Sequence, residues 1–127
     1  MSEAVIDTSI IVDHLRNVPQ ATALIERIRE GAMVGYISVL TEAELFAGKD
    51  SEDGDERAQL LELLSLFHKM DVTEGIARVA GDFRRKYGSP LVDAVIAATS
   101  FMTRCKVITQ NLRDFERIKE ITAEKLY

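Results

Sequence analysis

Short apolar runs alternate with longer helical stretches along this chain, and that alternation constrains the fold more than any other feature. Four runs have the length and composition of buried strands: 5–6 (VI), 33–38 (MVGYIS), 70–72 (MDV) and 106–109 (KVIT). A fifth lies within 120–127 (EITAEKLY). Strands connected through helices run parallel, with helices covering both faces of their sheet. The sequence therefore predicts an α/β fold with a central parallel sheet of about five strands.

The stretches between these runs have helical spacing, and residues typical of helix ends bound them. The predicted helices span 8–15, 20–30, 41–48, 57–69, 73–88 and 89–104. The polar stretch 49–56 (KDSEDGDE) is predicted to be a solvated loop, because it lacks the alternating ligands of a calcium-binding EF-hand. A chain of 127 residues is of ordinary size for one domain, so we expect residues 1–127 to form a single domain.

Composition excludes several classes of protein. A net charge of −5 argues against a domain that binds nucleic acid through a broad basic face. The start lacks the apolar segment of a secretory signal, and the longest apolar stretch, 91–102, is too short to span a bilayer, so no membrane role is expected. Cys105 is the only cysteine and is expected to be a small buried residue of a cytoplasmic protein. His14 and His68 lack the spacing of a zinc site and are expected at the surface or half-buried.

Four acidic residues follow predicted strands or begin predicted helices, and each also has a purely structural interpretation. Asp7 and Asp114 are placed to cap the turns after strands. Thr41 and Glu44 have the spacing of a capping box. Asp93 falls in a first helical turn, after Ser89 as the expected cap and Pro90 at the first helical position, where the helix dipole favours a carboxylate. Taken singly, none of these acids indicates a functional site.

Their shared position favours a site. The carboxyl ends of parallel strands lie along one edge of the sheet, where open α/β folds bind their ligands. Asp93 is flanked by apolar residues with no lysine or arginine nearby, so a divalent cation is an economical partner for a buried carboxylate. Oxygen ligands suit Mg²⁺ or Mn²⁺ better than zinc. Glu42 should point to the opposite side of its helix from Glu44, so only Glu44 is expected to reach the site.

Four segments in this order resemble the PIN-domain family, and specifically the VapC-type toxins of toxin–antitoxin pairs: VIDTS, ISVLTEAELFAG, LVDAVIAAT and VITQNLRDFERI. The resemblance covers nearly the whole chain and implies a PIN-like three-layer fold. It places Asp7, Glu44 and Asp93 on the three acidic positions of the family, with Asp114 as the expected fourth. Asn111 stands where the family often has an acid or an amide, which leaves open whether Asn111, Asp114 or both complete the site.

The resemblance also implies Mg²⁺- or Mn²⁺-dependent endoribonuclease activity, homodimers, and neutralisation by a small antitoxin. We expect Asp7 and Asp93 to ligate the metal directly, with Glu44 ligating through water or orienting the nucleophile, and with a hydroxyl from Thr8 or Ser9 as a further ligand.

Basic residues near these segments are candidates for contacts to the substrate. Arg16, Lys49 and Arg113 are candidates for contacts to RNA phosphates, with plain surface solvation as the alternative for each, whereas 84–86 (RRK) is interpreted as a solvated helix face. Single-stranded or looped RNA is a better candidate substrate than duplex DNA, because the chain has no recognition-helix motif.

Two alternatives belong to other classes of protein. A response-regulator receiver has a similar length and architecture, but Asp7 lacks an acidic neighbour and the acid of the third strand, Asp71, lies inside the predicted strand. The other alternative is a non-catalytic interaction module on a degenerate PIN fold.

Overall fold

The computed structural model describes residues 2–127, except for the side chains of residues 49 and 50. The strands are β1 (Ser2–Ile6), β2 (Met33–Ser38), β3 (His68–Met70), β4 (Lys106–Thr109) and β5 (Ala123–Lys125). The α-helices are α1 (Thr8–Leu15), α2 (Pro19–Arg29), α3 (Val39–Phe46), α4 (Gly54–Leu64), α5 (Glu74–Tyr87) and α6 (Leu91–Thr103). Two short 3-10 helices are η1 (Lys49–Glu52) and η2 (Leu112–Asp114).

All pairs of neighbouring strands are parallel, in the order β3-β2-β1-β4-β5. The chain builds outward from β1 to β3 and then returns to place β4 on the other side of β1. The strand order therefore reverses between β1 and β4, and this is the point where open α/β sheets form ligand-binding crevices. The predicted α/β class and the five parallel strands are confirmed.

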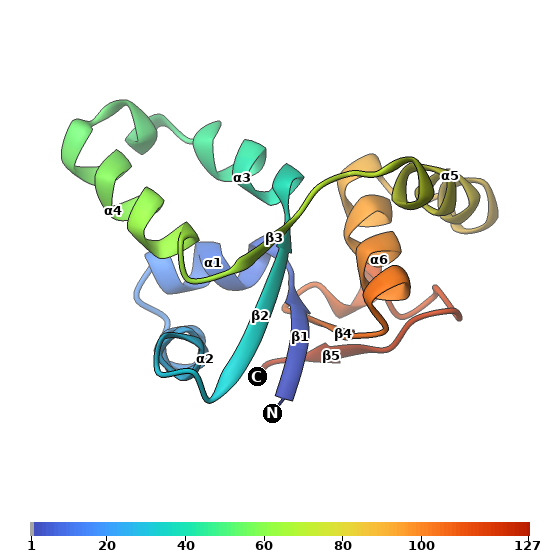
Figure 1. The fold of residues 1–127 in the computed structure, drawn as a ribbon, viewed down its shortest axis with the longest axis horizontal. Coiled ribbons are helices and arrows are strands. Elements are labelled where there is room, and N and C mark those ends of the chain that lie inside the picture. Colours follow the sequence, from blue (N-terminus) through green and yellow to red (C-terminus); the bar gives the residue numbers. More distant parts are fainter. Residues whose placement is uncertain (1) are drawn as a thin grey trace.

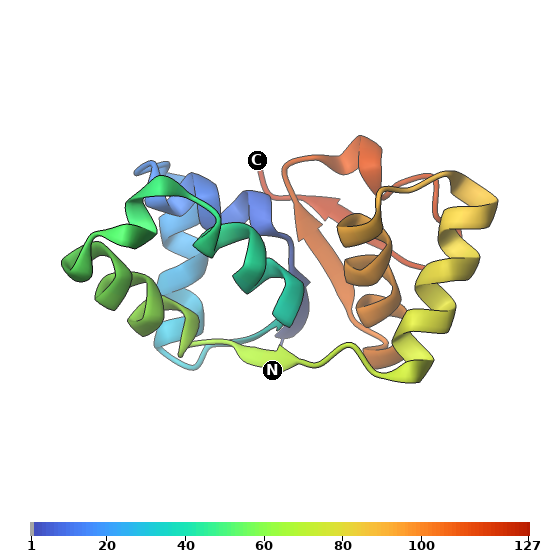
Figure 2. The same cartoon turned by 90° about the horizontal axis from the view of Figure 1, so that it is seen from above.

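Successive side chains of β1 point to opposite faces of the sheet and pack in two separate cores. The fold therefore has three layers. Ala4 and Ile6 pack in a cluster with residues of α1, α2 and α4. Val5 points to the other face, in a cluster with residues of α5 and α6. Figure 1 shows α1, α2 and α4 on one side of the sheet and α5 and α6 on the other. Helix α3 contacts both α1 and α6, so it bridges the two sides above the sheet edge, and the view from above shows it between the two groups of helices (Figure 2).

Gly35 in β2 is required by close packing between the sheet and its neighbours. A Cβ atom at this position would lie 2.8 Å from Cδ1 of Ile28 and 3.0 Å from Cδ1 of Phe67. Real Cβ atoms do not approach that closely, so a side chain here would displace both neighbours.

Several predicted boundaries are wrong. Helix α4 ends at Leu64 instead of residue 69, and β3 begins at His68 instead of residue 70. The stretch 49–56, predicted to be a loop, contains η1 and the start of α4, whose first turn is capped by the side chain of Asp53. Over residues 2–127, the structure contains no helix long and apolar enough to cross a membrane.

Candidate active site

Asp7 lies where β1 passes into α1, and its carboxylate is held by hydroxyl groups. Its backbone N donates to the carbonyl of Ile108 at 2.9 Å, which fixes the end of β1 against β4. The side chain is buried but forms no helix-capping bond, so the capping interpretation of Asp7 is wrong. Instead, Oδ2 accepts from Ser9 Oγ at 2.7 Å and from Thr109 Oγ1 at 2.8 Å. Both hydroxyls bind the same oxygen, which leaves Oδ1 available to a ligand.

Thr109 is a site residue that sequence analysis missed. It is fully buried at the end of β4, and its Oγ1 accepts from the backbone N of Asn111 at 2.9 Å while bonding Asp7. Ser9 makes a parallel link, because its Oγ accepts from the backbone N of Gln110 at 3.1 Å. The two hydroxyls therefore join Asp7 to the loop that follows β4. A threonine ending a strand was the available signal, but its pairing with Asp7 depends on the strand order.

Glu44 reaches the same edge from α3. This helix begins at Val39, and Ser38 is its cap, accepting from Leu40 N at 3.1 Å. Thr41 is consequently buried inside the helix, and the predicted capping box with Glu44 is wrong. Glu44 Oε1 accepts instead from Thr8 Oγ1 at 2.6 Å. As predicted, Glu42 points elsewhere, pairing with Lys69 Nζ at 2.6 Å.

Asp93 is half-buried in the first turn of α6. Pro90 occupies the cap position of this helix, and the hydroxyl of Ser89 is buried with no hydrogen-bond partner among the described residues, so the expected Ser89 cap is wrong. Burial first, and then the negative charges of Asp7, Asp114 and Glu44, raise the pKa of Asp93 to about 6. The other three predicted acids therefore lie within electrostatic reach of Asp93.

Asn111 and Asp114 lie in the turn after β4, and both are exposed. The turn is held by its backbone, since Asp114 N donates to the carbonyl of Asn111 at 2.9 Å, and Asn111 makes no side-chain cap. Within the described part of the chain, the side chain of Asp114 forms no hydrogen bond, so the expected cap by Asp114 is wrong as well. Both residues line a cavity of about 480 Å³ at the carboxyl ends of β4 and β5. Their side chains are free to contribute to a site at this edge.

The donor set matches a divalent cation in chemistry and charge. The four carboxylates carry oxygen donors of the kind that such an ion prefers, and no basic group among the described side chains lowers the pKa of Asp93. Within the described part of the chain, however, no three His, Cys, Asp or Glu side chains converge closely enough to share one ion. The hydroxyls of Thr8 and Ser9, expected as possible ligands, are engaged with Glu44 and Asp7.

The candidate phosphate contacts differ in their placement. Arg16 and Glu44 line one cavity of about 460 Å³. Arg113 lies in the cavity that contains Asn111 and Asp114. The side chain of Lys49 lies outside the described residues. The run 84–86 is exposed, in agreement with a solvated helix face.

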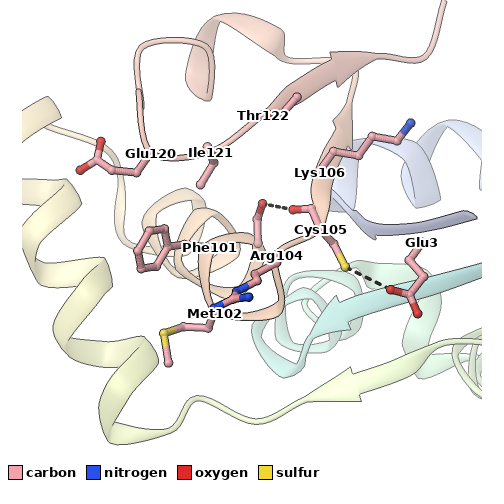
Figure 3. A pocket seen from close by; sticks show the side chains of 10 residues that line it. Glu3, Phe101, Met102, Arg104, Cys105, Lys106, Glu120, Ile121 and Thr122 are labelled. Carbon is pink, nitrogen blue, oxygen red and sulfur yellow. Dashed lines mark hydrogen bonds between the residues drawn. The ribbon is translucent and has the colours of Figure 1, made fainter.

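A cavity of about 850 Å³ lies away from these acids, at the amino ends of β1 and β4 (Figure 3). Its lining mixes charges, with Glu3, Arg104 and Lys106 around the thiol of Cys105. Cys105 is half-buried and its thiol donates to Glu3 at 3.7 Å, so the expected burial is only partial. His14 is half-buried and His68 is exposed, as predicted.

Comparison with known proteins identifies the class. A family model of the PIN domain matches residues 4–121, so the chain belongs to the PIN-domain family. The chain is 37% identical to Ribonuclease VapC19 of Mycobacterium tuberculosis over 122 residues, which cover 91% of this chain and 94% of that relative. It is 32% identical to Ribonuclease VapC10 of the same species, covering 91% and 88%.

A solved structure gives the same result at the level of the fold. A chain of a toxin–antitoxin complex from Klebsiella pneumoniae superposes with a TM-score of 0.81 at 27% identity, covering 98% of both chains. The predicted family and its PIN-like fold are thus confirmed. The receiver alternative is wrong, because receivers share the flavodoxin-like strand order 2-1-3-4-5, which differs from the order observed here.

Proposed function

We propose that this chain is a ribonuclease that hydrolyses RNA phosphodiester bonds with Mg²⁺ or Mn²⁺, and that it is the toxin of a VapBC-type toxin–antitoxin pair. One observation carries the proposal: at the edge where the strand order reverses, burial first, and then the negative charges of Asp7, Asp114 and Glu44, raise the pKa of Asp93 to about 6. A fold tolerates such repulsion where a bound cation relieves it. The names of the relatives, ribonucleases VapC19 and VapC10, support the choice of RNA as substrate.

Asp7 and Asp93 would hold the metal directly, with Asp114, Asn111 or both completing its oxygen ligands. A divalent metal bound there lowers the pKa of a water molecule and offsets the charge that develops on the phosphate. The pair of hydroxyls on Oδ2 of Asp7 fixes the direction of its free oxygen, Oδ1. Such outer contacts orient a ligand and tune its affinity for metal.

Glu44 has a separate role in this mechanism. Thr8 Oγ1 donates to its Oε1 at 2.6 Å, which restrains the carboxylate at the end of α1. Restrained in this way, Glu44 can accept a hydrogen bond from the attacking water or bind the metal through a water molecule. Positioning of this kind contributes about 10²-fold or more to hydrolysis.

The same proposal covers the partners and the location of the chain. We infer a small antitoxin as protein partner, a homodimer as the assembly, a single domain over residues 1–127, and the cytoplasm as the location. The solved relative from Klebsiella pneumoniae, a toxin–antitoxin complex, supports the antitoxin. We expect the open reading frame upstream to encode this antitoxin, and co-expression of the two chains should yield a stable complex with reduced ribonuclease activity. A complex that cleaves RNA as fast as the free chain would contradict neutralisation.

A cleavage assay on single-stranded RNA tests the activity itself. We expect cleavage with Mn²⁺ or Mg²⁺, none with EDTA, and none from Asp7→Asn. Asp82→Asn is the matched control, because Asp82 lies exposed on α5 in a surface pair with Arg85. Asp82→Asn should cleave like the wild type. An inactive wild-type chain that still binds the antitoxin would favour a non-catalytic interaction module instead.

A further inference from the structure

A second basic residue accompanies Arg113 in the cavity at the carboxyl ends of β4 and β5. Lys125 of β5 and Arg113 of η2 both line this cavity of about 480 Å³, together with Asn111 and Asp114. The other lysine of this sheet region, Lys106, is paired with Glu124 at 3.0 Å. Within residues 2–127, neither Arg113 nor Lys125 forms an ion pair with a protein carboxylate. Two basic side chains are thus available to an external anion beside the candidate active site.

Gln110 links the two segments that carry the basic residues. Its Oε1 accepts from the backbone N of Leu126 at 2.9 Å and of Tyr127 at 3.1 Å, and its Nε2 donates to the carbonyl of Tyr127 at 3.3 Å. These bonds tie the residues after β5 to the loop that carries Arg113. The pairing of Thr109 with Lys125 fixes the register of the two strands at the same place.

The net charge of the cavity depends on whether the adjacent candidate active site holds a metal ion. Asp114 and Glu116 also line the cavity, so two carboxylates balance two basic groups there. Asp114 belongs to the proposed metal site, and a divalent ion would offset its charge. The cavity would then carry net positive charge, on a chain whose overall charge of −5 otherwise repels RNA.

We propose that Arg113 and Lys125 form a subsite for a non-reacting phosphate of single-stranded RNA, adjacent to the phosphate that is cleaved. This inference rests on the proposed ribonuclease function. Binding of such a remote phosphate anchors the strand and sets its register against the acids. Because the contact is made equally before and during the reaction, its loss should raise KM and leave kcat nearly unchanged.

The test uses the full chain and a single-stranded RNA oligonucleotide, with binding measured by fluorescence anisotropy at several monovalent salt concentrations and a constant concentration of Ca²⁺, whose looser coordination positions an attacking water less strictly than Mn²⁺. Each lost phosphate contact should reduce the slope of log affinity against log salt by about 0.7, and because Arg113 and Lys125 bind one phosphate, Arg113→Gln/Lys125→Gln should reduce it by about 0.7. Between about 50 and 150 mM salt, the affinity of the wild type should therefore fall about twofold more than that of the double variant.

Arg27→Gln/Lys119→Gln is the matched control, with the same change in charge. Both residues are exposed, and neither lines this cavity. The control should keep the wild-type slope and the wild-type KM in a Mn²⁺-dependent cleavage assay, whereas the Arg113 and Lys125 variants should raise KM. Equal melting temperatures would exclude a loss of fold.

The outcomes separate the subsite from the function on which it rests. A wild type that cleaves RNA, with unchanged slope and KM in Arg113→Gln/Lys125→Gln, overturns the subsite alone. Equal losses in the test and control variants also overturn it, because they indicate an effect of total charge. A wild type that neither binds nor cleaves RNA overturns the proposed ribonuclease.

Discussion

Neutralising Asp93 should stabilise the metal-free protein. Its pKa is raised from 3.8 to about 6 by burial and by the charges of Asp7, Asp114 and Glu44. A difference of about two units corresponds to an upper limit of about 3 kcal/mol. Solvent reaches the half-buried carboxylate and screens part of this energy, so we expect about 1.5 kcal/mol. For a chain of this length, Asp93→Asn should raise the melting temperature in EDTA at pH 7 by about 5 °C.

The stabilisation expected for Asp93→Asn should depend on pH, and its direction follows from the raised pKa of Asp93. Folded Asp93 binds its proton more tightly than unfolded Asp93, so its contribution to the free energy of unfolding is fully present below about pH 4. That contribution is lost as pH rises through about 6, when the folded carboxylate ionises. The asparagine of the Asp93→Asn variant cannot titrate. The difference between variant and wild type should therefore be smallest at about pH 4 and reach its plateau above about pH 6.

Adding Mn²⁺ should reverse the order of stability. A ligand at about a hundred times its dissociation constant stabilises the folded state by roughly 2.7 kcal/mol. The wild type should gain this amount, whereas Asp93→Asn, lacking a ligand, should gain little. Thermal denaturation with and without metal measures both effects, with Asp82→Asn as the unchanged control. A drop of many degrees for Asp93→Asn in EDTA would show that Asp93 is a structural helix residue and refute the reasoning.

Periodicity and turn residues predicted most of the fold because they report local interactions. The strands at 33–38 and 106–109 have the predicted bounds, and a strand was found within 120–127. Gly31, predicted to follow a helix, has a positive φ of 79° after α2. Such positions depend on the conformation of a few neighbouring residues, which the sequence shows directly.

The errors occurred where two local signals overlapped. Phe67 continues the apolar spacing of α4, although the helix ends at Leu64, so the predicted helix ran into the edge strand β3. Ser38 and Thr41 are both good caps three residues apart, and the end of β2 decides between them. The residues around these positions do not distinguish the alternatives, because packing against the sheet makes the choice.

The site was predictable in outline for a different reason. The carboxyl ends of parallel strands lie along one edge of the sheet in any fold of this class, so Asp7 and Glu44 could be placed at that edge before the strand order was known. Asp93 begins α6, which follows α5 directly, and it was grouped with them from its apolar neighbours and the family resemblance. The hydroxyl of Thr109 could not be assigned in that way. It lies 102 positions from Asp7 in sequence, and only the adjacency of β4 to β1 brings them to 2.8 Å.

Three further predictions test the side chains that build this edge. Glu44→Gln should slow RNA cleavage by about a hundredfold. Glu42→Gln should leave the cleavage rate nearly unchanged, because Glu42 pairs with Lys69. Equal losses of activity in the two variants would show that the orientation of α3 is wrong. Gly35→Ala should lower the free energy of unfolding by about 1–3 kcal/mol through overpacking. Gly81→Ala is the control, and it should raise the melting temperature because Gly81 has open space around it. A Gly35→Ala variant more stable than Gly81→Ala would contradict the packing described for β2. Thr109→Val keeps the shape of the side chain but removes the hydroxyl that holds Asp7, so calorimetry should find Mn²⁺ affinity reduced by about tenfold. Thr109→Ser retains the hydroxyl and should restore that affinity, and equal affinities in the valine and serine variants would show that the bond to Asp7 does not position the ligand.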